Sequence, residues 1–401
     1  MHNVLHVVSY SYPPANVPAA HRPDQMTRYL KRSGIAFRAY TREGVIDSSR
    51  KKGSKVAQTG GAKKSVSHAS KGRLMSLAAK LGLLLEVDKA TLWGITTFPR
   101  LWWDLVRFRF RTGRRATVWT TSPLVTNIYL ATFAGIFSFS DVHLDLRDAI
   151  RGINGSRMPL FTRLAVNYAK TSTVVTPSLR QFILRRAPKL NPQIVYNGIS
   201  DDALLSAKKL ALDKRHRITL AYVGAVYGGD RPYVQAMEWL ALAASELSKP
   251  WTGLSLTFVG REDVSDLPLR YVCDAFQINA GGEVGKQEAL NISADSNINI
   301  VLVGKSEEHR CGIPLKIYDL LGVGRPILYI GPADSDAVRF LEEFAAGDFF
   351  MIDTEADHPA SIETLAEWLC DAASKETSAK CEPSSSSQVR KILQLIGMES
   401  Y

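Results

Sequence analysis

Short apolar runs alternate along the chain with longer segments in which apolar residues follow a helical spacing. The runs of the first half cover residues 4–8, 37–40, 117–119, 142–146, 172–175 and 193–195. Those of the second half cover residues 218–223, 254–259, 276–279, 298–303 and 327–330. Strands that alternate with helices form parallel sheets covered by helices. The pattern therefore predicts an α/β protein with two Rossmann-like halves.

The length of 401 residues supports two domains, because a single core rarely grows that large. The change of domain is expected between Asn197 and Arg217, and we assign residues 1–200 to an N-terminal domain and 201–382 to a C-terminal one. A serine-rich break then precedes a final helix in residues 383–401. The apolar pattern of this helix allows it to pack on either domain.

The composition excludes several classes of protein. Hydrophobic residues make up 45% of the chain and charged residues 22%, which excludes wholesale disorder, a collagen-like fibre and a polytopic membrane protein. The uncharged stretch 116–140 contains Pro123 and several hydroxyl residues, so it predicts a buried strand, turn and helix. The N-terminus does not read as a secretory signal, and four scattered cysteines favour a reducing compartment. We expect a cytoplasmic protein.

The net charge of +11 is concentrated in two stretches. Residues 48–72 are rich in Lys, Ser and Gly without any acid, which is typical of a mobile basic loop. Residues 81–115 combine Trp, Phe and Leu with arginines. Such a segment can hold a protein on the inner face of an anionic membrane, or its aromatics can pack on the sheet while its arginines are solvated. The rest of the chain is about neutral, which argues against a nucleic-acid partner.

A series of short motifs follows the expected strands. In order they are Ser11-Tyr12-Pro13-Pro14, Thr121-Ser122-Pro123, Asp145-Leu146-Arg147-Asp148, Val195-Tyr196-Asn197-Gly198, Tyr222-Val223-Gly224, Phe258-Val259-Gly260 and Lys316-Ile317-Tyr318-Asp319. In order and spacing, over nearly the whole chain, they resemble the retaining nucleotide-sugar glycosyltransferases of family 4. The resemblance implies the GT-B fold, two Rossmann-like domains whose parallel sheets face a central cleft. It also implies transfer of a sugar from a nucleoside diphosphate to a glycan or lipid-linked acceptor, with retention, in bacterial surface polysaccharide synthesis.

Glycines and cations in the second half are candidates for binding the diphosphate of the donor. Gly224 follows the first strand of that half, so backbone amides and the next helix can approach a phosphate there. Arg231 can add a charge-assisted contact. By resemblance Gly260 also belongs to the donor site. The alternative is that the glycines serve only the turn.

Lys316 and Asp319 lie one turn apart on a helix expected to begin near Pro314. By resemblance Asp319 takes the position of the family's ribose-binding glutamate, and Lys316 helps to neutralise the diphosphate. An ordinary ion pair between them is the alternative. Many family members carry a further glutamate where this chain has Cys311. Any role of that acid is therefore missing here.

Asp145, Arg147 and Asp148 follow a strand of the first half and are the candidate catalytic residues on the acceptor side. A carboxylate there can accept the proton of the acceptor hydroxyl, although in retaining transfer the leaving diphosphate can take it. A structural Asp-Arg-Asp cluster is the alternative. Asn16 and Arg22 can reach donor or acceptor, but the residues between them lack the glycine pair of the family.

No metal site and no cofactor are expected. Asp334-Ser335-Asp336 resembles a metal-binding Asp-x-Asp motif, but its position after Gly331-Pro332 favours a helix cap. His143 on a strand favours a buried core histidine. Two other functions stay open beside the transferase: a GT-B sugar-nucleotide epimerase, and a scaffold on the membrane surface that has kept the fold without catalysis.

Overall fold

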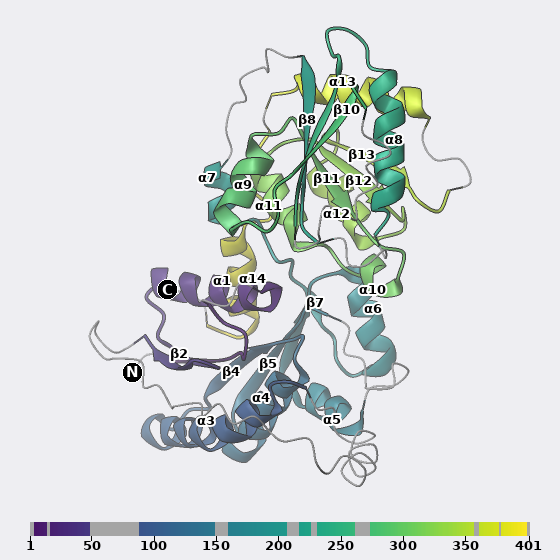
Figure 1. The fold of residues 1–401 in the computed structure, drawn as a ribbon. Coiled ribbons are helices and arrows are strands. Elements are labelled where there is room, and N and C mark those ends of the chain that lie inside the picture. The colour runs from purple at the N-terminus through teal and green to yellow at the C-terminus, as the bar shows by residue number, and fades with distance from the viewer. Residues whose placement is uncertain are drawn as a thin grey trace, which may run out of the picture. The chain divides into compact units, whose positions relative to one another are not determined.

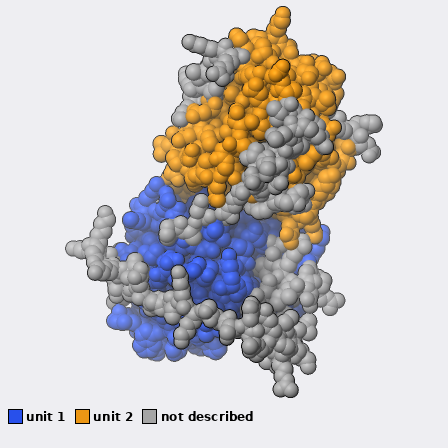
Figure 2. Space-filling model, viewed as in Figure 1, with its two compact units in different colours: residues 1–196, 388–401 blue, residues 197–387 orange. Residues whose placement is uncertain are grey.

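The chain folds into two compact units (Figures 1 and 2). The computed structural model describes residues 4–13, 17–48, 88–148, 159–206, 216–225, 231–260, 273–356, 361–376 and 378–398. Unit 1 comprises Met1–Tyr196 and Gln388–Tyr401, and unit 2 comprises Asn197–Ser387. The change of unit thus falls between Tyr196 and Asn197, and the chain returns to unit 1 at its end.

Unit 1 is built on a seven-stranded sheet in the order β3-β2-β1-β4-β5-β6-β7. Its strands are β1 (Leu5–Val8), β2 (Phe37–Thr41), β3 (Gly44–Asp47), β4 (Thr117–Thr121), β5 (Asp141–Leu146), β6 (Thr171–Val174) and β7 (Gln193–Ile194). Its helices are α1 (Pro18–Arg32), α3 (Thr91–Thr112), α4 (Val125–Ser138), α5 (Leu160–Tyr168), α6 (Pro177–Arg186) and most of α14 (Ser385–Leu395). All pairings are parallel except that of β3, which runs antiparallel to β2.

Helices cover both faces of this sheet, and two apolar cores result. On one face α3, α4, α5 and α6 pack on the strands through residues such as Leu101, Ala131 and Val166. On the other face α1 and α14 contribute Met26 and Ile392. The strands are therefore buried from both sides, which is why they appear in the sequence as continuous apolar runs.

Unit 2 has a six-stranded sheet, parallel throughout, in the order β10-β9-β8-β11-β12-β13. Its strands are β8 (Arg217–Val223), β9 (Gly253–Val259), β10 (Phe276–Ala280), β11 (Ile298–Leu302), β12 (Ile327–Gly331) and β13 (Phe349–Asp353). Its helices are α7 (Asp201–Ser206), α8 (Tyr233–Ser245), α9 (Lys286–Ala294), α10 (Glu307–Arg310), α11 (Leu315–Val323), α12 (Asp336–Phe344) and α13 (Ile362–Ser374). This strand order is that of a Rossmann-like domain.

Local sequence signals fix several helix ends. The hydroxyl of Thr176 caps α6 by accepting a hydrogen bond from the Leu179 amide, and Pro177 occupies the first turn. Ser335 caps α12 in the same way through the Val338 amide. Asp334-Ser335-Asp336 is thus the start of a helix, as expected. The interpretation of residues 116–140 as strand, turn and helix is also confirmed, by β4 and α4.

The α/β prediction with two Rossmann-like parallel sheets is confirmed, and the structure adds two edge strands, β3 and β13, to the expected set. The final helix packs on unit 1, where Val389 and Ile392 join the core of β1. The basic loop 48–72 lies outside the described residues except for Ser48. No helix within the described ranges combines the length and hydropathy needed to cross a bilayer.

Two buried histidines make the stability of unit 1 depend on pH. Burial, more than any other cause, lowers the pKa of His6 and His143 to about 4 from the usual 6.5. The unfolded chain takes up these protons first, so stability is full above pH 6.5 and falls as the pH drops to about 4. The loss amounts to about 3 kcal/mol for each histidine.

We expect the thermal midpoint of the protein to fall markedly between about pH 7 and about pH 4.5. The double variant His6→Gln, His143→Gln should lose most of this dependence. As a control, His216→Asn changes an exposed histidine whose φ of 53° suits asparagine. An equal loss of stability with falling pH in the double variant would contradict the assignment.

Candidate functional site

The candidate site of unit 2 lies where β8 ends, between its neighbours β9 and β11. The strand order reverses at β8, because the chain moves outward to β9 and β10 and then returns to β11 on the other side. Open parallel sheets bind their ligands at such a switch point, outside the carboxyl ends of the strands. The residues that follow β8 are therefore the first to consider.

Gly224 directly follows β8 and has a backbone conformation that favours glycine, with φ +136°. Its amide donates a hydrogen bond of 2.8 Å to the carbonyl of Val259. A Cβ built at this position would lie 3.6 Å from Nζ of Lys316. That distance is an ordinary contact, so the backbone conformation, and not lack of space, favours glycine here, and the ammonium of Lys316 lies beside this backbone.

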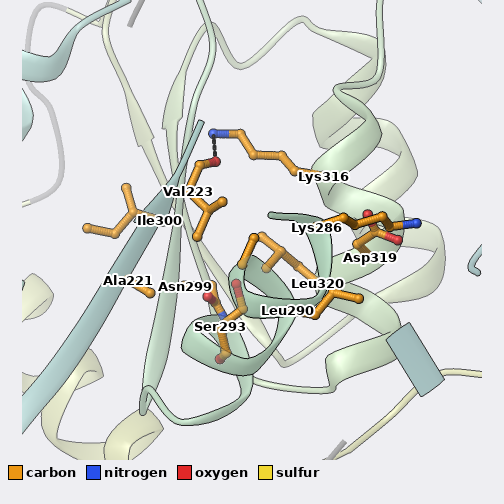
Figure 3. Close-up of a pocket in the computed structure, with 11 residues that line it drawn as sticks. Ala221, Val223, Lys286, Leu290, Ser293, Asn299, Ile300, Lys316, Asp319 and Leu320 are labelled. Atoms are coloured by element: carbon orange, nitrogen blue, oxygen red, sulfur yellow. Dashed lines mark hydrogen bonds between the residues drawn. The ribbon is translucent and has the colours of Figure 1, made fainter. Parts of the chain in front are cut away.

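Lys316 lies in the first turn of α11 and points toward the end of β8 (Figure 3). Its Nζ donates to the carbonyl of Val223 at 3.4 Å and sits 4.0 Å from the centroid of the Tyr222 ring. No carboxylate within the described ranges forms an ion pair with it. Burial, and then the charge of Arg231, hold the pKa of Lys316 well below its usual value.

Arg231 brings a second positive charge to the same place. Its Nη1 donates to the carbonyl of Ala225 at 2.6 Å and to the hydroxyl of Tyr222 at 3.1 Å, and that hydroxyl donates to the same carbonyl at 2.8 Å. The guanidinium is thus fixed by Tyr222 near the end of β8 and by the carbonyl of Ala225 just after the strand. Two neighbouring positive charges repel each other, which disfavours the charged form of each. An anion bound between them would offset this repulsion and stabilise both charged forms.

Asp319 lies one turn after Lys316 and faces α7 instead. The Oγ of Ser200 donates a hydrogen bond of 2.8 Å to its Oδ1. Burial raises the pKa of Asp319, and the charge of Lys286 opposes this shift. The ion pair between Lys316 and Asp319 that the sequence left open is not formed, although both residues are described. A carboxylate with one hydrogen bond remains able to accept others.

A pocket lies along the sheet between α9 and α11, and Lys316 and Asp319 both line it (Figure 3). It is lined by Ala221, Val223, Lys286, Ala289, Leu290, Ser293, Asn299, Ile300, Lys316, Asp319 and Leu320. Its volume of about 60 Å³ is far below that of a pocket for a whole ligand, about 300 Å³ or more. It can therefore enclose only a part of one.

Gly260 directly follows β9, the neighbour of β8, and its amide donates to the carbonyl of Gly282 at 3.0 Å. It lies at the same edge of the sheet as Gly224 but not among the pocket residues.

Sequence reasoning assigned no role to Ser200 or Lys286, which the structure places beside Asp319. The signal for Ser200 was its position before Asp201-Asp202, typical of a helix cap, and its Oγ indeed accepts from the Ala203 amide.

In unit 1 Asp145 and Arg22 form a fully buried ion pair. The Nε of Arg22 donates to Oδ2 of Asp145 at 3.1 Å, and neither side chain has exposed surface. Thr173 donates to the other oxygen at 2.6 Å. Arg22 also donates to the carbonyls of Val195 and Tyr196, at 3.1 Å and 2.8 Å. This network connects the end of β5 to α1 and to Val195 and Tyr196, the last residues of the first segment of unit 1.

Arg147 and Asp148 lie just beyond β5, where Asp148 is exposed. The amide of Arg147 donates to Oγ of Ser122 at 2.7 Å, and that of Asp148 does so at 3.3 Å. The buried hydroxyl of Ser122 therefore fixes the backbone that presents both side chains.

Asn16 lies outside the described residues, and His143 is buried against Thr171 as a core histidine.

No protein-family model matches the chain, and no curated protein matches it. Solved structures do, at low identity. Sucrose-phosphate synthase from Thermosynechococcus elongatus superposes with a TM-score of 0.54 at 13% identity, covering 99% of this chain and 97% of that one. A putative UDP-N-acetylglucosamine 2-epimerase from Listeria monocytogenes gives 0.53 at 13%, covering 99% and 96%. A trehalose-6-phosphate structure from E. coli, bound with UDP-2-fluoro glucose, gives 0.54 at 11%, covering 98% and 96%.

At such identities the likeness shows the fold. The class that it defines is GT-B, with two Rossmann-like domains on parallel sheets, and this expectation is confirmed. Membership of glycosyltransferase family 4 in particular stays a prediction.

Proposed function

We propose that this protein is a glycosyltransferase that moves a sugar from a nucleoside diphosphate to a glycan or lipid-linked acceptor, with retention at the anomeric carbon. One observation carries the proposal. Lys316, without an acidic partner in the described parts of the chain, meets the backbone of Gly224 at the switch point of the unit 2 sheet, with Arg231 nearby. Cations and glycine backbone at that place suit a diphosphate.

In this proposal the diphosphate lies against Gly224, Lys316 and Arg231, and Asp319 accepts the hydroxyls of the ribose. Asp319 is suited to this role because burial raises its pKa and Ser200 supplies only one hydrogen bond. Two ribose hydroxyls would provide the hydrogen bonds that a buried carboxylate needs. Gly260 at the neighbouring strand end completes the donor edge.

The reaction breaks the bond between the anomeric carbon and the diphosphate oxygen, and the electron pair leaves with the diphosphate. The acceptor oxygen bonds to the same face of that carbon, and its proton passes to the leaving diphosphate. Lys316 and Arg231 stabilise the negative charge that develops on the leaving group. The proposal requires no divalent metal ion, since these two cations neutralise the diphosphate.

Unit 1 supplies the acceptor side of the proposed reaction. In this proposal the exposed Asp148 and the adjacent Arg147 bind acceptor hydroxyls, and it is supported by the hold that Ser122 has on their backbone. Asp145 is buried and engaged, so its part is to hold the end of β5 in place through Arg22. The acceptor class and the setting in bacterial surface polysaccharide synthesis come from the family resemblance.

The test is product analysis with nucleoside diphosphate sugars and a mixture of lipid-linked and soluble glycan acceptors. We expect release of nucleoside diphosphate coupled to a new glycosidic bond, whose configuration at the anomeric carbon NMR shows to be that of the donor. Asp319→Ala should lower turnover at least about 100-fold, because it removes two hydrogen bonds to a charged group. Asp371→Ala, at an exposed ion pair with Lys375, is the matched control.

Equal turnover of Asp319→Ala and the control would contradict the assigned donor site. An inverted product would contradict retention. Conversion of the donor to a free epimeric sugar, without any acceptor product, would replace the transferase by an epimerase.

A further inference from the structure

Helix α3 is apolar on two opposite faces. Gly94, Leu101 and Leu105 are buried against the unit 1 sheet, and Phe98 and Phe108 pack on the same core. The outward side nevertheless carries Trp103 and Phe110, which are 56% and 86% exposed. These two residues lie seven positions apart and therefore share one stripe of the helix. A surface helix of a soluble domain normally has polar residues there.

Two further exposed aromatic residues lie at the end of α4, the helix beside α3. Phe137 and Phe139 are 62% and 65% exposed. Trp102 joins the two helices, since its indole Nε1 donates to the carbonyl of Phe137 at 3.2 Å and its ring lies 6.4 Å from that of Trp103. Figure 1 shows α3 and α4 on the same side of the sheet. We call Trp103, Phe110, Phe137 and Phe139 the aromatic patch.

Phe139 occupies a backbone conformation that phenylalanine disfavours. It follows the last turn of α4 with φ 56°, in the left-handed region where glycine or asparagine is usual. Its ring gains little from burial inside the protein, because most of it is exposed. Within the described ranges the guanidinium of Arg109 lies over the ring, but the ring is otherwise largely exposed, so packing inside the fold gives little reason for an aromatic residue here.

Positive charge surrounds the aromatic patch. The six arginines of residues 94–115 are all exposed, and Arg109 lies over the Phe139 ring at 5.2 Å. The acid of this stretch, Asp104, is directed inward, where it binds Arg38 at 2.9 Å and Tyr40 at 2.8 Å. Of the six arginines, Arg115 pairs with Asp141 at 3.5 Å, and the other five have no acidic partner within the described ranges. The outer side of α3 and the turn after it therefore present aromatic rings and guanidinium groups together.

We propose that the aromatic patch and the arginines of α3 dock unit 1 onto an anionic lipid bilayer. Phe and Trp side chains enter the interface between head groups and acyl chains, and arginines bind the anionic head groups. A protein partner with an acidic groove is less well matched, because Trp103 and Phe110 lie on one exposed stripe of α3 and project from the helix. The docking is independent of the sugar transfer.

The test compares binding of the full-length protein to vesicles of equal parts phosphatidylglycerol and phosphatidylcholine with binding to phosphatidylcholine alone. Sedimentation at about 0.1 M salt should show binding to the anionic vesicles only, weakening as salt is raised. The variant Phe110→Ser, Phe139→Asn should bind at least about tenfold more weakly. Asparagine suits the conformation of residue 139, so this variant should unfold at no lower a temperature than Phe110→Ser alone.

Two further variants separate the contributions. Arg111→Gln with Arg114→Gln should lower binding by about fivefold for each arginine removed. Leu205→Ser, which removes an 85% exposed leucine of unit 2, should bind like the unchanged protein. Unchanged activity toward soluble acceptors in all of these variants would show that the donor site is intact.

Three results would overturn the proposal. One is the absence of binding to anionic vesicles. Another is binding that survives loss of both phenylalanines, which would assign the attraction to charge alone. The third is a dimer in sedimentation velocity, without lipid, that Phe110→Ser, Phe139→Asn dissociates, because the aromatic patch would then bind a second copy of the chain.

Discussion

Replacing Lys316 by alanine is expected to weaken nucleoside diphosphate binding at least about 100-fold, since charged hydrogen bonds to a diphosphate are worth about 3 kcal/mol or more together. Its ammonium makes one long hydrogen bond, to Val223, and meets the Tyr222 ring, so its charge is available to an anion. Its removal should not unfold unit 2. The measurement is a calorimetric titration of the variant with the nucleotide that the unchanged protein binds.

The control for Lys316→Ala is Lys375→Ala. Lys375 also donates to a backbone carbonyl, that of Gly347 at 3.0 Å, but it follows α13 and lies outside the pocket residues. It should bind nucleotide normally. If both variants bind alike, the diphosphate is held elsewhere.

The pKa of Lys316 gives this prediction a second, independent signature. Burial and Arg231 lower that pKa in the free protein, and a bound diphosphate would raise it again. Binding should therefore take up protons, and affinity should fall as the pH rises through the pKa of the free lysine. The calorimetric enthalpy should then change with the ionisation enthalpy of the buffer, and it should not do so in Lys316→Ala.

Breaking the buried pair in unit 1 is expected to have the second large effect. Asp145→Asn removes the carboxylate that pairs with the guanidinium of Arg22, at a position where neither side chain has exposed surface. Loss of one partner of a buried ion pair costs about 3–5 kcal/mol. Urea unfolding followed by circular dichroism should show that loss in the free energy of unfolding of unit 1.

Two further variants test the origin of this loss. Asp24→Asn breaks the partly exposed pair with Arg28, whose two side chains are 24% and 59% exposed, and should cost less than about 1 kcal/mol. Adding Arg22→Met to Asp145→Asn also removes the buried positive charge and should restore part of the stability. A stable Asp145→Asn protein that has lost only turnover would instead make Asp145 a catalytic residue.

Most of the fold could be predicted because parallel strands covered on both faces need apolar side chains throughout. β3 escaped prediction because it is a half-buried edge strand whose residues, Gly44–Asp47, show no apolar run. β13 contains the apolar run 349–352 and was detectable by the same criterion as the other strands. The apolar stripe of α14 could pack on the core of either unit. The chain returns from unit 2 to unit 1 at Gln388, and the spacing of apolar residues along the sequence does not show which unit the helix joins.

The candidate site could be predicted only as a set of residues. The spacing of Lys316 and Asp319 places them one turn apart, yet one side chain meets the end of β8 and the other meets Ser200. Which neighbour each faces depends on how α11 packs. Similarly, nothing local indicates that Arg22 reaches Asp145, 123 residues further along the chain.

The most direct test of a donor site in unit 2 is calorimetric titration of the purified protein with UDP, GDP, ADP and CMP in turn, at moderate salt and with EDTA present. We expect one nucleoside diphosphate to bind at micromolar affinity, and Asp319→Ala to abolish that binding. Absence of binding by all four nucleotides, or binding that Asp319→Ala leaves unchanged, would contradict the account.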